Sequence, residues 1–364
     1  MGTHPIYVPM LKGKEGEFAA LEALSGDVKP HLMPLIEFPG VPFDYANERP
    51  SKSLDEHVEG LSGRLDKLQR IWPNAPLYLH LPWFGEGERL KDGRVALESV
   101  LADCMKEGIN AVPVVSRSSS HDEVRAAARY SANAETGACV RLFIEDFKED
   151  IDLDEEVGRL WRELGSVGSN SLDVIIDLGD LHPEANLVAR SVLSMIPEKD
   201  QWRRMILAAA SFPEDLSDVG AATTSTIPRR EWELWKTLQR RPNILPRRDL
   251  IFGDYAIAHP LPKELDPRIM QMSASIRYTT PDDWLVVKGR NVRQYGFDQY
   301  FELCKTLIGR PEYSGRDFSW GDRYIDDCAN GMLGPGNATT WRKVGTNHHL
   351  TLVTRELAKL RPGA

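Results

Sequence analysis

Short apolar runs alternate with amphipathic stretches along most of the chain. The runs are about four to nine residues long, are rich in Val, Ile and Leu, and are mostly apolar on both faces, which is typical of parallel strands covered by helices. In the stretches between them, apolar residues recur at helical spacing, as Leu61, Leu65 and Leu68 do within 54–71. The runs predict strands at 6–12, 32–38, 76–83, 110–117, 139–146, 172–178, 204–211 and 249–257. The stretches between them predict helices at 15–25, 54–71, 94–108, 121–133, 154–164, 184–197 and 230–240.

The order of these elements favours one fold class. Eight strand–helix steps within about 250 residues are what a (β/α)8 barrel requires. The alternative is a doubly wound open sheet, which normally carries a glycine-rich turn after its first strand. Here that turn, 12–17, reads KGKEGE, which is neither a dinucleotide fingerprint nor a phosphate-binding loop. The sequence therefore predicts an α/β fold, a TIM-like (β/α)8 barrel.

The pattern changes after the eighth predicted strand. Two strand-like runs, 273–280 and 283–290, are joined by the turn PDD and predict a hairpin. A helix predicted over 298–308 would complete the barrel. A short helix near 322–330 and a final helix near 350–360 follow, separated by a glycine-rich loop.

These elements predict a barrel with a C-terminal elaboration made of a hairpin, short helices and a loop-rich tail. We assign residues 1–310 to the barrel, with 258–297 as an insertion, and 311–364 to an extension packed on it. No linker-like composition separates the two parts.

Composition narrows the class of protein. Of 364 residues, 41% are apolar and 27% are charged, which is ordinary for a globular protein, and no apolar run reaches the roughly 18 residues of a membrane-spanning helix. The N-terminus lacks the pattern of a secretory signal. The four cysteines are widely spaced and form no CxxC pair, so disulfides and zinc modules are not expected. We therefore expect a cytoplasmic protein that does not act at a membrane.

The formal net charge of −9 argues against a nucleic-acid coat protein, but the charge is uneven. From Gln271 onward the chain has 13 Lys+Arg and 10 Asp+Glu, so this part is basic. The rest of the chain has 32 Lys+Arg and 44 Asp+Glu and is acidic. The C-terminal part can thus contact a phosphate-bearing partner, or it is simply a solvated basic surface.

Candidate chemistry lies at the predicted strand ends, because (β/α)8 barrels place their reacting groups there. Side chains alternate along a strand, so Arg141 and Glu145 share one face, as do Asp173 and Asp177. One carboxylate is expected to act as a general base, with Lys and Arg groups binding an anion. The candidate catalytic residues are Glu145, Asp177 and Asp254. The candidate ligand-binding residues are Lys12, Lys14, Glu37, His80, Arg117, Arg141 and Asp173.

The same charges have structural interpretations. Buried charges must pair, so Lys12 with Glu37 and Arg141 with Asp173 form the alternative, a salt-bridge network. His80 alone is more often a core histidine than a metal ligand. No cofactor is identified by the sequence; a divalent metal such as Mg²⁺ would find oxygen ligands in Glu37, Glu145, Asp177 and Asp254.

Two further segments carry polar side chains. Ser116–Ser120 can bind an anion at a helix start, but Ser120 followed by Glu123 also fits a capping box. No GxSxG motif is present, which disfavours a serine hydrolase. In 319–349, aromatic and polar residues either form a recognition surface or, through the two tryptophans, attach the tail to the barrel. The candidate interaction residues are Trp320, Asp322, Asn337, Trp341 and His348.

Several stretches resemble a known family. They are YVPMLKGKEGEFAALEAL, PLIEFP, ASFPEDL, IPRREWELW, FGDYAI, SWGDRYIDDCANG and GNATTWRKVGTNHH, in this order along nearly the whole chain. Together they are similar to the phage beta protein family, which also occurs in bacteria. The resemblance implies one barrel-like unit and makes Lys12, Lys14, Glu37, Asp254 and 319–349 family-typical positions, but it carries over no catalytic residue.

Two functions remain open at this point. The resemblance implies a role in phage–host conflict, in anti-phage defence or a toxin–antitoxin-like assembly, as a subunit that binds a ligand or a protein partner encoded nearby. The alternative is a hydrolase, similar to a phosphodiesterase or nuclease, that acts on a nucleotide or nucleic-acid end at the barrel mouth.

Overall fold

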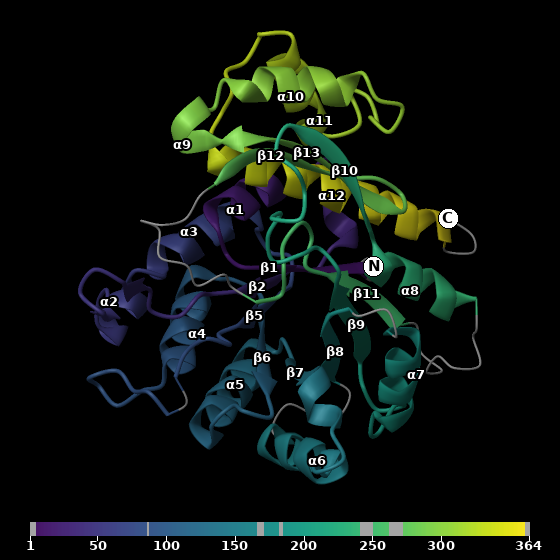
Figure 1. Cartoon of the computed structure of the whole chain (residues 1–364). Helices are drawn as coiled ribbons and strands as arrows, with labels where there is room; N and C mark the ends of the chain where they lie inside the picture. Colours follow the sequence, from purple (N-terminus) through teal and green to yellow (C-terminus); the bar gives the residue numbers. More distant parts are fainter. Residues whose placement is uncertain are drawn as a thin grey trace.

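The computed structural model describes residues 5–85, 87–165, 171–181, 185–240, 250–261 and 272–360. Its main body is a closed barrel of eight parallel strands in the order β1-β11-β9-β8-β7-β6-β5-β2 (Figure 1). This confirms the predicted TIM-like (β/α)8 fold and all eight predicted strands. The strands are β1 (Tyr7–Leu11), β2 (Leu35–Glu37), β5 (Leu77–His80), β6 (Ala111–Ser116), β7 (Ala138–Phe143), β8 (Leu172–Asp180), β9 (Arg204–Ala210) and β11 (Leu250–Asp254).

Helices surround the barrel, as the amphipathic stretches predict. The stretch 54–71 forms two helices, because Gly60 ends the first and the second starts at Ser62. Residues Phe43–Asp44 (β3) and Arg49–Pro50 (β4) form a small ladder, and Lys29–His31 and Ile144–Phe147 are 3-10 helices. The helices are α1 (Glu15–Glu22), α2 (Leu54–Glu59), α3 (Ser62–Ile71), α4 (Ala96–Glu107), α5 (His121–Ala134), α6 (Leu153–Glu163), α7 (Ala185–Met195) and α8 (Arg230–Gln239).

The barrel interior is packed with side chains. Outward-facing strand residues join the helices in one large core, whereas inward-facing residues such as Met10, Leu35, Val114 and Ile175 form a separate apolar cluster. The described inward-facing residues therefore fill the barrel, and the buried charged side chains among them, such as Arg141 and Asp173, lie toward its two ends.

The C-terminal elaboration contains an antiparallel sheet with strand order β10-β13-β12. The predicted hairpin is present as β12 (Ser273–Thr279) and β13 (Asp283–Asn291). The third strand, β10 (Thr223–Pro228), comes from between β9 and α8 and was not predicted, because its sequence TTSTIP is polar and largely exposed. Residues 262–271 of the predicted insertion lie outside the described residues.

One long helix joins the two parts of the molecule. In α12 (Ala338–Leu360), Trp341 and Val344 pack in the C-terminal cluster, whereas Leu350, Val353 and Leu357 belong to the barrel core. Figure 1 shows α12 lying between the small sheet and the barrel, next to α1. The helix begins twelve residues earlier than the final helix predicted near 350–360; it is buried on most sides and so lacks a clear polar face.

The helix predicted over 298–308 does not complete the barrel. It is present as α10 (Gln299–Ile308), which packs with α11 (Trp320–Ala329) on the small sheet, after the short helix α9 (Val292–Tyr295). The barrel is covered by α12 instead, because α12 carries the apolar residues that reach the barrel core. The division of the chain at residue 310 stays a prediction.

The structure also bears on disulfide bonds and on membrane-spanning helices. Cys104, Cys139, Cys304 and Cys328 are buried free thiols. Among the residues that the structure describes, no helix combines the length and apolar character needed to cross a membrane. A cytoplasmic location stays a prediction.

The role of α12 can be tested with Leu350→Ala. Leu350 is fully buried in the barrel core, so we expect the free energy of unfolding to fall by about 2–5 kcal/mol in urea titrations. Met332→Ala is the matched control, because this side chain is 61% exposed and its loss should cost less than about 0.5 kcal/mol. Equal stability of the two variants would show that α12 does not contribute to the barrel core.

Candidate functional site

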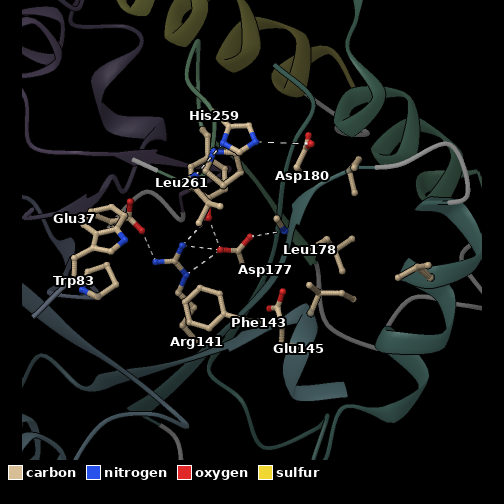
Figure 2. A pocket seen from close by; sticks show the side chains of 17 residues that line it. Glu37, Trp83, Arg141, Phe143, Glu145, Asp177, Leu178, Asp180, His259 and Leu261 are labelled. Atoms are coloured by element: carbon tan, nitrogen blue, oxygen red, sulfur yellow. Dashed lines mark hydrogen bonds and ion pairs between the residues drawn. The ribbon is translucent and has the colours of Figure 1, made fainter. Parts of the chain in front are cut away.

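A buried arginine occupies the centre of the barrel mouth (Figure 2). The guanidinium of Arg141 donates to Oδ2 of Asp177 from Nε (3.0 Å) and Nη2 (2.6 Å). Its Nη1 donates to Oε1 of Glu37 (2.6 Å) and to Nδ1 of His80 (2.8 Å). Its Nη2 also donates to the hydroxyl of Tyr255 (2.7 Å), and this hydroxyl donates in turn to Asp177. One cation thus holds side chains from four other strand ends.

These side chains converge because parallel strands end at the same edge of the barrel. Glu37 and His80 are the last residues of β2 and β5, and Tyr255 directly follows β11. Side chains alternate along a strand, so residues two positions earlier also face inward. Those earlier residues are members of the inner apolar cluster: Leu35, Tyr78, Cys139 and Ile175. The polar network is therefore the last inward-facing layer above an apolar interior.

Burial controls the protonation of this layer. Burial raises the pKa of Glu37, while the guanidinium of Arg141 opposes that rise. Burial and the neighbouring guanidinium hold the pKa of His80 well below its usual range, so the imidazole is neutral. Arginine can only donate, so Nδ1 of His80 is the acceptor and its proton resides on Nε2.

The hydrogen-bonding capacity of Arg141 is used completely. A guanidinium has five N–H donors, and all five have partners here. An incoming anion would have to displace one of these partners: Glu37, His80, Asp177 or Tyr255. Arg141 therefore fixes two carboxylates in place and offers no free donor to a ligand.

The predicted salt-bridge pairs are wrong in their partners. Arg141 pairs with Glu37 and Asp177, and Lys12 donates to the carbonyl oxygen of Pro260. Asp173 lies four residues before Asp177 in β8, about 13 Å away at strand spacing, near the opposite end of the barrel. There it accepts hydrogen bonds from three side chains, those of Tyr78, Arg203 and Arg204.

One oxygen of the network has no partner. Oε2 of Glu37 is buried and makes no hydrogen bond within the described residues, although Oε1 is held by Arg141. A buried acceptor without a donor costs about 1–3 kcal/mol. Nearby, the ammonium of Lys12 lies 4.9 Å from the ring centre of Trp83; burial lowers the pKa of Lys12 to about 8, and the charge of Glu37 opposes this.

A cavity of about 700 Å³ opens above this network. Its floor includes Glu37, Arg141, Asp177 and Tyr255, and Glu145 and Asp180 add two carboxylates to its lining. Gly179 adopts a left-handed conformation (φ 61°), and its N–H donates to Asp177. The apolar lining is formed by Pro82, Trp83, Phe143, Ile144, Leu178, Leu181, Val188, Pro260 and Leu261.

The predicted site residues fall into two groups. Lys12, Glu37, His80, Arg141, Glu145 and Asp177 lie at or directly beneath the barrel mouth. The others do not meet them. Lys14 is exposed before α1, and Arg117 pairs with Asp146 (2.6 Å).

Asp254 also lies away from the cavity. It accepts hydrogen bonds from the hydroxyl of Tyr7 (2.5 Å) and from Nε2 of His349 (2.9 Å), and it is 1% exposed. His349 in turn bonds the hydroxyl of Thr279 (2.9 Å) through Nδ1. Asp254 therefore links the barrel to α12 and β12.

The four proposed metal ligands are not brought together, since Asp254 is separate and Arg141 neutralises Glu37 and Asp177. Within the described residues, no group of three His, Cys, Asp or Glu side chains has the arrangement to hold a metal ion.

The capping interpretation of the serine segment is confirmed. Ser120 caps α5: its N–H donates to the Glu123 carboxylate (2.8 Å), and the Glu123 N–H donates to its hydroxyl (3.4 Å). The serine side chain and the first turn of the helix therefore satisfy each other.

The five predicted interaction residues mostly serve the C-terminal part itself. Asp322 and His348 form a buried pair (2.8 Å), so neither is available to a partner. Asn337 caps the start of α12 by accepting from the Thr340 N–H (3.1 Å). The ring of Trp341 stacks on Tyr300 of α10, with centroids 4.1 Å apart, so it attaches α12 to α10 rather than to the barrel. The ring of Trp320 covers the ammonium of Lys343.

Tyr255 and Trp83 belong to the site and stand at predicted strand ends, but they were not among the candidate site residues named from the sequence. Tyr255 completes the hydrogen bonds of Arg141, and Trp83 forms a wall of the cavity. Alternation along β11 could have identified Tyr255, which follows the inward-facing Ile251 by four positions. Trp83 is the last residue of the predicted strand 76–83, although in the structure it lies in the loop after β5.

Comparison with known proteins gives one family match. A family model described as Beta protein matches residues 7–355. No curated protein sequence matches the chain. Among solved structures, it is similar to type I 3-dehydroquinate dehydratase from Clostridium difficile with covalent modified comenic acid (13% identity, TM-score 0.40, 71% of this chain and 88% of that one).

A second structural likeness is to the carboxyl transferase domain of Rhizobium etli pyruvate carboxylase with 3-bromopyruvate (12% identity, TM-score 0.36). The alignment covers 95% of this chain and 48% of that one, so the chain spans about half of its length. Likenesses this weak carry no functional argument.

The network predicts a strong effect of Arg141→Leu. Removing the guanidinium leaves two carboxylates buried without a counter-charge, so we expect a loss of about 3–5 kcal/mol in the free energy of unfolding. Arg129→Leu, which breaks an exposed pair with Glu98, should cost less than about 1 kcal/mol. Adding Glu37→Gln and Asp177→Asn to Arg141→Leu should recover part of the loss; no recovery would contradict the charge argument.

Lys12 predicts a pH dependence of stability. Its folded-state pKa of about 8 lies below the usual 10.5, so between these values the unfolded chain binds one more proton. Stability contributed by Lys12 therefore rises with pH across this window, by about 3 kcal/mol in total. In urea titrations from pH 7 to 10.5, the free energy of unfolding of wild type should increase relative to that of Lys12→Met as the pH rises. A difference between the two proteins that does not change with pH would contradict the lowered pKa.

Proposed function

The chain belongs to the Beta protein family, and we propose that this member binds a small organic molecule in the cavity at the mouth of its barrel. The observation that carries the proposal is a cavity of about 700 Å³ whose lining includes Glu37, a buried residue with one carboxylate oxygen, Oε2, that has no hydrogen-bond partner within the described residues. Ligand cavities are typically 300–1,000 Å³, and in (β/α)8 barrels they lie at this end of the strands.

The carboxylate of Glu37 is held in a fixed position, which favours the recognition of a ligand. Arg141 fixes Oε1 of Glu37, so Oε2 has a defined position and direction. The layer beneath is apolar and closed, so the position of Glu37 is not averaged over many rotamers. A ligand that supplies a donor to Oε2 would recover the hydrogen bond that is missing without it.

Two exposed apolar side chains line the cavity. Val188 is 40% exposed and Leu261 is 66% exposed, and both line the cavity. Covering them would remove apolar surface from water, which stabilises a complex by about 25 cal/mol per Å² buried. The proposed ligand therefore has an apolar body and a polar end.

The hydrolase alternative receives less support. Arg141 has no donor left for a phosphate, and four carboxylates line the cavity. A dianionic substrate would meet repulsion without a compensating clamp. A role in phage–host conflict and a protein partner stay predictions that rest on the family resemblance.

A fragment screen tests the proposal. A ligand at about 100 times its Kd stabilises the folded state by about 2.7 kcal/mol, which is a shift in Tm of several degrees. Ile144→Trp would fill the cavity that Ile144 lines, so we expect it to abolish the shift. Leu333→Trp, on an exposed loop, is the control that should keep it. Fragments that shift wild type and Ile144→Trp equally, or shift neither, would contradict the proposal.

A further inference from the structure

The charges around the cavity are unbalanced. The lining contains four carboxylates, those of Glu37, Glu145, Asp177 and Asp180, but one guanidinium, Arg141. Arg141 is shared between Glu37 and Asp177. Within the described residues, Glu145 makes no ion pair or hydrogen bond, and Asp180 meets only His259, at 3.8 Å. The cavity therefore has uncompensated negative charge on its floor and on its wall.

Lys12 does not reverse this balance. Its ammonium donates to the carbonyl oxygen of Pro260 and lies beneath the ring of Trp83, so it is 4% exposed and does not line the cavity. Its positive charge partly offsets the charge of Glu37, but Oε2 of Glu37 still has no hydrogen-bond donor within the described residues. A ligand in the cavity thus meets carboxylate oxygens rather than the ammonium.

Aromatic rings complete the pattern. Trp83, Phe143 and Tyr255 line the cavity, and each ring already faces a cation: Lys12 lies near Trp83 and Tyr255, and Arg141 lies 4.7 Å from the centre of Phe143. Ring faces attract cations, and they do so more strongly where water is excluded. The same walls accept an apolar or aromatic body.

From these observations we infer that the ligand is an organic cation, an amine on an apolar or aromatic body, whose ammonium donates to Oε2 of Glu37. This inference rests on the proposed function, because it names the ligand class for the same cavity. An ammonium–carboxylate hydrogen bond is charge-assisted and about twice as strong as a neutral one. An anion of the same shape would find no free donor on Arg141, the one guanidinium among the described residues of the lining.

Isothermal titration with three molecules of similar shape tests the charge. The probes are phenethylamine, 2-phenylethanol and 3-phenylpropanoate, at low salt and neutral pH. We expect the amine to bind about tenfold or more tightly than the alcohol, a difference of about 1.4 kcal/mol, and the carboxylate to show no binding. Tighter or equal binding of the alcohol or the carboxylate would overturn the inference and leave the small-molecule proposal standing.

Variants locate the cation. Glu37→Gln should weaken amine binding about tenfold or more without affecting the alcohol. Because this change also disturbs Arg141, Glu145→Gln provides a second variant on an exposed wall residue, with an expected loss of about threefold. Glu302→Gln, exposed on α10, should leave amine affinity unchanged. Unchanged affinity in both cavity variants would overturn the inference.

If none of the three probes binds wild type, the inference is overturned. The fragment screen with Ile144→Trp then decides separately whether the cavity binds other molecules, so the two failures are distinguishable.

Discussion

The structure depends on keeping one buried guanidinium paired. Arg141 has essentially no exposed surface, and its charge is tolerable only because Glu37 and Asp177 hold it from two sides. The hydrogen bonds of Arg141 hold the ends of β2, β5, β7 and β8 and the residue after β11 in one layer. They also use every donor of the arginine, so Arg141 keeps no free donor for a ligand. The preference for a cation that we propose for the site thus follows from a structural need of the barrel.

The C-terminal part is joined to the barrel by buried polar contacts as well as by apolar packing. His349 of α12 connects Asp254 at the end of β11 with Thr279 of β12. Gly345 allows a close approach, because a Cβ there would lie 3.0 Å from the carbonyl oxygen of Arg277. Buried networks of this kind fix one geometry, since each partner left unpaired is costly. Asp254 thus has a structural role, although it stands at a strand end.

Much of the fold could be predicted from periodicity, whereas the site could be predicted only in part. Two-sided apolar runs are a strong signal, and they located all eight barrel strands. Strand ends also pointed to Glu37, Arg141 and Asp177, which the structure brings together at the barrel mouth. The ion-pair partners could not be predicted, because they depend on how far along the barrel axis each side chain lies. Asp173 and Asp177 share a face of β8 but lie near opposite ends of the barrel. The helix that covers the barrel was misassigned because α12 is buried on most sides and shows no amphipathic stripe.

A crystal structure of the protein soaked with phenethylamine tests the central claim most directly. The account predicts the nitrogen within about 2.7–3.2 Å of Oε2 of Glu37, the ring against Trp83 or Phe143, and an unbroken Arg141 pair with Asp177. An amine whose nitrogen faces away from Glu37, or an anion bound to Arg141 in place of Asp177, would contradict it.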